Sequence, residues 1–223
     1  MAAPHAPWSL TGECVLAWAA SPAGELPADL CALPGPALVT AARFESSPVG
    51  PYLELAVSRP ARLGARPGMC VTLMVVDTHD ACVGGRVNWG FPKEVGALQW
   101  EESGDERALT WREREVRVQA TPSGPAMPVV LPMRALQRRA DGLVVVPGRL
   151  RGRARVSRVE IEAAEGDTLA ALAGQRRGLL VSGLKLAVDP ARRPTGLSAT
   201  LRAPLRAPEP ALSSGGRNGH RGD

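Results

Sequence analysis

Short runs in which hydrophobic and polar positions alternate occupy much of this 223-residue chain. In residues 52–57, one face of a strand would carry Leu53, Leu55 and Val57. The other face would carry Tyr52, Glu54 and Ala56. Comparable strand patterns cover residues 8–20, 37–44, 107–120, 143–146 and 179–188. The strongest apolar run, 69–77, predicts a central buried strand.

Glycine and proline divide these runs and set the expected connections. We expect a loop over 59–68, an antiparallel return strand over 80–87, a hairpin turn over 102–105 and irregular structure over 121–132. Short helices are expected over 27–33 and 168–173. In 149–163 the apolar residues move from even to odd positions, which predicts a bulge or bend near Ser157.

The predicted elements are many strands and two short helices, which indicates a mainly β (α+β) protein with antiparallel connections. Residues 1–7 form an expected flexible arm, and residues 8–205 a single domain. Residues 206–223 are rich in Pro, Ser, Gly and Arg. That composition predicts a disordered tail.

Charge and cysteine content exclude several classes of function. The net charge is +5, but acidic residues are spread through the chain, so no face of one sign is expected. The arginines of 149–155 lack interleaved aromatics and are expected on a solvated sheet face, without a nucleic-acid partner. Four cysteines without metal-like spacing and three histidines do not support a metal site or a Ser-His-Asp triad. No leader or apolar span is recognised, so we expect a cytoplasmic protein without a membrane partner.

Candidate chemistry centres on residues 84–96, which contain one of the two lysines of the chain. Arginine stays protonated, whereas a lysine amine among apolar groups loses its proton more readily and can attack a ketone to form an imine. Trp89, Phe91 and Pro92 are placed to supply apolar walls around Lys93. The alternative is a solvated lysine in a glycine-rich loop.

Glu54 is the second candidate. It is either a pocket carboxylate that shuttles a proton or an ordinary carboxylate on the solvent face of its strand.

Two motifs in register resemble the acetoacetate decarboxylase family. Residues 85–96 match its Gly-Arg, then Gly-aromatic-Pro-Lys-Lys, then apolar-Gly pattern, and residues 47–54 resemble the approach to its essential carboxylate. The resemblance implies a Schiff-base lysine at Lys93 and an acid/base or water-positioning group at Glu54. It also implies a curved antiparallel sheet forming a cone or barrel around a central apolar cavity, often in homo-oligomers.

The implied function is that of a decarboxylating lyase on a small oxo acid or ketone, without a cofactor or a metal. Tyr52, Arg86, Trp89 and Phe91 would bind the substrate. The alternatives are an aldolase or dehydratase that uses the same imine, and a non-catalytic member that binds a small apolar ligand.

Three positions depart from the family pattern. The second lysine is Glu94, and a carboxylate facing the amine there would keep it protonated; neighbouring residues of a strand, however, point to opposite sides. Val87 replaces a glutamate that follows Gly-Arg in many members. The N-terminal arginine that holds a substrate carboxylate has no clear counterpart, and Arg43 or Arg86 is the candidate to replace it.

Overall fold

A computed structural model describes residues 3–20 and 26–194. These residues form eleven strands and one α-helix, α1 (His79–Trp89), with two single turns of 3₁₀-helix, η1 (Arg112–Arg114) and η2 (Ala170–Leu172). The strands are β1 (Trp8–Ala19), β2 (Cys31–Ala32), β3 (Ala37–Ser46), β4 (Tyr52–Leu63), β5 (Arg66–Val76), β6 (Lys93–Val95), β7 (Leu98–Ser103), β8 (Glu106–Trp111), β9 (Val116–Arg139), β10 (Gly142–Glu162) and β11 (Gly174–Val188).

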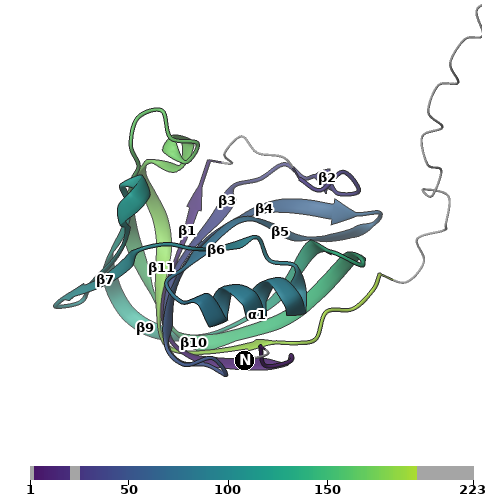
Figure 1. The fold of residues 1–223 in the computed structure, drawn as a ribbon. Helices are drawn as coiled ribbons and strands as arrows, with labels where there is room; N and C mark the ends of the chain where they lie inside the picture. The colour runs from purple at the N-terminus through teal and green to yellow at the C-terminus, as the bar shows by residue number, and fades with distance from the viewer. Residues whose placement is uncertain (1–2, 21–25, 195–223) are drawn as a thin grey trace, which may run out of the picture.

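The strands form one curved sheet in the order β6-β5-β4-β3-β1-β11-β10-β9-β8-β7, with β2 paired to β4. Every pairing is antiparallel except those that β5 makes with β6 and β9. The β5–β9 pairing, at Met69 opposite Ala135, joins the two sides of the sheet and closes the barrel. Figure 1 shows the strands curving around a central space, with α1 lying across it. The expected mainly β cone or barrel is confirmed.

The two faces of the sheet have separate roles. Leu55 and Val57 of β4 lie in a buried core with Leu109 and Trp111 of β8, where the sheet curls back on its own outer face. Residues of the opposite parity on β4 line a central cavity: Tyr52, Glu54, Ala56 and Ser58. The predicted division of residues 52–57 into two faces is therefore confirmed.

The connection from β5 to β6 differs from the expectation. Residues 80–87 form most of α1, not an antiparallel return strand, and His79 is the first residue of this helix. A parallel strand pair needs a crossover, and α1 provides it. Glycine costs a helix about 1 kcal/mol relative to alanine, so Gly84 and Gly85 hid the helix from a sequence-based prediction.

The β9–β10 hairpin also differs from the expectation, because residues 121–132 are strand and not irregular structure. β8 pairs with β9 only as far as Ala120, and β5 only at Ala135. Between these points β9 has β10 as its single neighbour, so it is an edge strand there. Proline is tolerated where a strand's N–H groups face no partner.

Smaller corrections concern turns. Residues 59–68 are strands on both sides of a tight turn at Gly64. Residues 27–33 form a turn and β2 instead of a helix, and the expected helix over 168–173 is reduced to η2. The predicted bulge is confirmed as a register shift between Ala154 and Val156.

The predicted tail, residues 206–223, lies outside the described residues. Within the described part, no helix is long and apolar enough to cross a membrane.

The closeness of β1, β10 and β11 gives a test of this packing. A Cβ atom at Gly178 would lie 2.4 Å from the Leu16 carbonyl oxygen and 2.5 Å from Val159 Cγ2. Because one contact is backbone, Gly178→Ala should lower the free energy of unfolding by about 1–3 kcal/mol. The measurement is chemical denaturation, with Arg177→Ala on the exposed side of the same strand as control. An unchanged midpoint for Gly178→Ala would contradict this register.

Candidate active site

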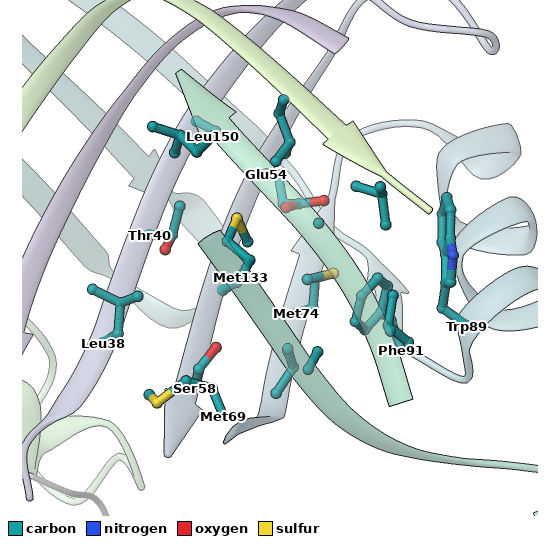
Figure 2. Close-up of a pocket in the computed structure, with 18 of the residues that line it drawn as sticks. Leu38, Thr40, Glu54, Ser58, Met69, Met74, Trp89, Phe91, Met133 and Leu150 are labelled. Atoms are coloured by element: carbon teal, nitrogen blue, oxygen red, sulfur yellow. The ribbon is translucent and has the colours of Figure 1, made fainter. Parts of the chain in front are cut away.

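The barrel encloses a cavity of about 540 Å³. Its walls come from β1, β3, β4, β5, β6, β9, β10, β11 and α1, and they are mostly apolar (Figure 2). Among the described residues, three charged side chains line it: Glu54, Lys93 and Arg134. A volume of this size is typical of a small-molecule site.

Lys93 and Glu54 meet inside this cavity. The Lys93 ammonium donates a hydrogen bond to Glu54 Oε2 over 2.8 Å, and the two residues are 2% and 8% exposed. Glu54 lies opposite Val76 across β4–β5, and Lys93 lies opposite Met74 across β5–β6. The two side chains therefore meet over the cavity face of β5, between their own strands. The other lysine, Lys185 on β11, is exposed.

Glycines of the motif make room for this arrangement. A Cβ atom at Gly85 would lie 2.5 Å from Lys93 Cδ and 2.6 Å from Lys93 Cε. One at Gly84 would lie 2.4 Å from the Trp8 ring. Gly90 ends α1 in the left-handed conformation, with φ of 71°. Its N–H donates to the Arg86 carbonyl, and the Phe91 N–H donates to the Gly85 carbonyl. The glycine spacing thus reflects the approach of α1 to the lysine.

Three aromatic side chains predicted as substrate contacts line the cavity: Tyr52, Trp89 and Phe91. Lys93 Nζ lies 5.0 Å from the centroid of the Tyr52 ring. Trp89 is held in place by its indole N–H, which donates to the Asp189 carbonyl over 2.8 Å, and by an edge-to-face contact with Trp8. These three positions place rigid apolar surface close to the amine.

Two other ionisable groups of the cavity stay neutral. Burial raises the pKa of the Cys14 thiol to about 12, and the negative charges of Glu13 and Glu54 act in the same direction. Burial also raises the pKa of Tyr52 well above its ordinary value, with further contributions from Glu54 and Asp77. Neither the thiolate nor the phenolate is therefore available near neutral pH.

Arg86, predicted to bind substrate, does not line the cavity. Its side chain is exposed, and its Nε donates to the carbonyl oxygen of Lys93 over 2.6 Å. The Cys82 thiol approaches the same oxygen at 3.3 Å. Arg86 thus fixes the backbone of the short strand β6 at the residue that carries the amine.

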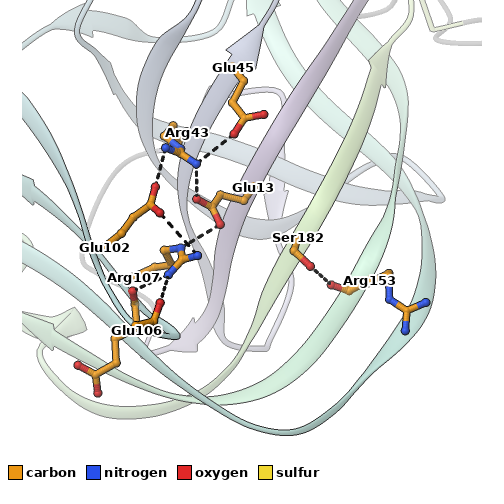
Figure 3. A network of polar contacts seen from close by, with 9 residues as sticks. Glu13, Arg43, Glu45, Glu102, Glu106, Arg107, Arg153 and Ser182 are labelled. Atoms are coloured by element: carbon orange, nitrogen blue, oxygen red, sulfur yellow. Dashed lines mark hydrogen bonds and ion pairs between the residues drawn. The ribbon is translucent and has the colours of Figure 1, made fainter.

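Arg43, the other candidate for holding a substrate carboxylate, is also outside the cavity. It forms ion pairs with Glu13, Glu45 and Glu102, at 2.8, 3.0 and 2.5 Å. Arg107 also pairs with Glu13, at 3.0 Å (Figure 3). This network ties the β7–β8 hairpin to β1 and β3, and both terminal nitrogens of Arg43 are paired within it.

Glu94 is exposed and does not line the cavity. It follows Lys93 on β6, so the two side chains leave opposite faces of the strand. Its carboxylate does not face the amine.

Sequence reasoning missed the part of the cavity wall that β5 and β9 provide, including Met69, Met74 and Arg134. Five consecutive residues of β9, 131–135, line the cavity there, so an alternating pattern would not have singled out Arg134. The described residues contain no group of three His, Cys, Asp or Glu side chains arranged to hold a metal ion.

Comparison with known proteins places this arrangement in a family. The sequence profile of acetoacetate decarboxylase matches residues 23–173, more than half of the chain. The chain therefore belongs to the acetoacetate decarboxylase family, and the resemblance seen in its motifs is confirmed. No curated protein matches the chain by sequence.

Solved structures agree on the fold. The acetoacetate decarboxylase of Legionella pneumophila is similar at 17% identity and a TM-score of 0.60, over 85% of this chain and 87% of that one. The acetoacetate decarboxylase-like enzyme of Sphingomonas wittichii RW1 is similar at 17% identity and a TM-score of 0.61, over 86% of this chain and 93% of that one. A third similar structure is that of the enduracididine biosynthesis enzyme MppR, complexed with the condensation product of pyruvate and imidazole 4-carboxaldehyde. It has 16% sequence identity and a TM-score of 0.62, over 86% of this chain and 90% of that one.

The enclosed ion pair gives a test by a double-mutant cycle. Removing one partner of a buried pair leaves the other charge unpaired, at a cost of about 3–5 kcal/mol. We expect Glu54→Gln to lower the free energy of unfolding by about 3 kcal/mol, and Glu54→Gln with Lys93→Met to recover most of that loss. Chemical denaturation of the four proteins measures the coupling. Additive losses would show that the two groups do not interact in solution.

Proposed function

We propose that this chain is a Schiff-base lyase that decarboxylates a 3-oxo acid. The observation that carries the proposal is the Lys93–Glu54 pair, at 2.8 Å within an apolar cavity. Lys93 is the nucleophile and Glu54 the proton carrier. The family membership of the chain supports this assignment.

The reaction begins with a proton transfer. Lys93 attacks as a free amine, so its ammonium must first give up a proton, and Glu54 Oε2 is the acceptor within hydrogen-bonding distance. The amine then adds to the ketone carbon. Glu54 returns the proton to the departing hydroxyl, water leaves, and a protonated imine joins Lys93 to the substrate.

The imine then provides the driving force for bond cleavage. The carbon–carbon bond to the carboxylate breaks, its electron pair forms the C=C bond of an enamine, the π pair of the C=N⁺ bond moves onto nitrogen, and carbon dioxide leaves. The carbon that lost carbon dioxide takes up a proton, with Glu54 as the nearest acid. Water hydrolyses the resulting imine, so a 3-oxo carboxylate and one proton yield a ketone and carbon dioxide.

The surroundings of the pair assist these steps. Charge decreases when an ammonium–carboxylate pair exchanges a proton, and also when a carboxylate leaves as carbon dioxide. Apolar surroundings penalise charge, so they favour both changes. Tyr52, Trp89 and Phe91 line the cavity, and in this proposal they orient the imine.

The same imine could serve an aldol or dehydration reaction, which is the second candidate function. The observation in its favour is the fold shared with MppR, whose structure holds a condensation product of pyruvate. A third reading, a non-catalytic subunit that binds a small apolar ligand, predicts no covalent adduct.

Reductive trapping tests the nucleophile. Incubation with 3-oxo acids or pyruvate and then borohydride should leave a reduced adduct on the peptide that carries Lys93, detected by mass spectrometry. Lys93→Arg should abolish the adduct and lower decarboxylation by more than about 1,000-fold, because a guanidinium cannot form the imine. The matched control is Lys185→Arg, which changes the exposed lysine. Decarboxylation that survives in Lys93→Arg would refute the proposal.

The space that Gly85 leaves for the Lys93 side chain provides a second test. In Gly85→Ala the new methyl group would displace the Lys93 side chain from its place beside Glu54. Misplacing a reacting group by about 1 Å can cost on the order of 100-fold in rate, whereas alanine favours the helix by up to about 1 kcal/mol. We expect lower kcat with unchanged or higher thermal stability. Full activity in this variant would show that the amine is not confined as the structure has it.

A further inference from the structure

We propose that the substrate of this site is a 3-oxo acid with a long or bulky apolar acyl group, and not acetoacetate; this inference rests on the proposed function. In acetoacetate the acyl group ends in a single methyl. The cavity has a volume of about 540 Å³. Since each water occupies about 30 Å³ of liquid, this equals the volume of about 18 water molecules. A substrate as small as acetoacetate would leave most of it unfilled.

The reactive pair lies at the buried end of the cavity. Lys93 is 2% exposed and stands opposite Met74 of β5. Four cavity-lining residues are exposed, all at the place where β5 and β9 approach each other: Pro67, Pro132, Met133 and Arg134. These residues mark the mouth.

The distance from the pair to the mouth sets the length of the substrate. Met74 and Met69 are five residues apart on β5, which corresponds to about 16 Å along a strand. Met69 stands opposite Ala135, next to the mouth. A ketone that reaches Lys93 from the mouth therefore has room behind it for a chain of many atoms.

The wall between these ends is suited to an apolar chain. It carries Leu38, Ala56, Val71 and Met74, with two hydroxyl residues, Thr40 and Ser58. Figure 2 shows Leu38, Thr40, Ser58 and Met69 grouped away from Glu54 and Phe91. No charged side chain of the described residues lies on this wall between the pair and Arg134.

Arg134 does not alter this assignment. Its guanidinium donates to the Pro67 carbonyl at the mouth, over 3.2 Å. In a 3-oxo acid the carboxylate is two bonds from the imine carbon, so it stays at the Lys93 end. Arg134 is therefore placed to attract an anion on entry, and it does not hold the carboxylate during the reaction.

The chemistry is unchanged by the longer chain. The bond between the carboxylate and the adjacent carbon breaks, carbon dioxide leaves, that carbon takes up one proton, and the product is a methyl ketone. The cavity determines how much of the acyl group is removed from water.

A chain-length series tests the inference. We expect kcat/KM to rise about fourfold for each added methylene while the chain remains in the cavity, across acetoacetate, 3-oxohexanoate, 3-oxooctanoate and 3-oxodecanoate. Carbon dioxide release is the readout. A preference for acetoacetate over all longer acids would overturn the inference and leave the proposed function in place.

Variants with larger side chains on the cavity wall provide a second test of the inference. Ser58→Leu and Thr40→Leu each extend a side chain into the cavity and should lower the ratio of kcat/KM for 3-oxodecanoate to that for acetoacetate by at least about tenfold. Ser9→Leu, at an exposed position of β1, is the control. An unchanged ratio in both folded variants would overturn the inference, and the second variant covers the case in which one does not fold.

A binding measurement separates the two possible failures. Methyl ketones of increasing length, such as 2-heptanone and 2-undecanone, should quench the tryptophan fluorescence of Lys93→Ala with a Kd that falls as the chain grows. If this holds while no oxo acid is decarboxylated by the unaltered chain, the proposed function fails and the preference of the cavity for long apolar chains stands.

Discussion

The buried contact between Lys93 and Glu54 is the constraint that the rest of this structure depends on. The two side chains start from β6 and β4, on either side of β5. Bringing them together requires β6 to run parallel to β5, and that pairing requires α1 as a crossover. The helix must approach closely, so it carries Gly85 where a side chain would strike the lysine. The two charges stabilise each other only because the closed barrel holds both in place.

The sequence predicts the part of this arrangement that is local. Alternation in residues 52–57 placed Glu54 on the same face as Tyr52, and both line the cavity. The alternation does not show whether this face is interior, because a strand whose polar face meets solvent has the same sequence pattern. The significance of Lys93 came from the resemblance of two motifs, because its burial depends on strands distant in sequence.

The features that the sequence concealed each have a physical cause. α1 contains two adjacent glycines, which weaken a helix, and it forms because those glycines fit against Trp8 and Lys93. The prolines of β9 suggested a loop, and they are accommodated where that strand has a single neighbour. Arg86 stands in the right motif but serves the backbone of Lys93. In all three cases tertiary contacts override local preference.

Two of the positions considered for departures from the family pattern, Glu94 and Arg43, lie outside the cavity in the structure. Glu94 replaces a lysine on the face of β6 away from the cavity, and Arg43 is committed to Glu13, Glu45 and Glu102. Neither change places a charge next to the amine, so the apolar character of the cavity is preserved. In the proposed decarboxylation, an arginine beside the substrate would stabilise the carboxylate that has to leave. An apolar wall gives that carboxylate little solvation, and its loss as neutral carbon dioxide removes the penalty. A site that binds its substrate through an apolar acyl group has no need of that arginine.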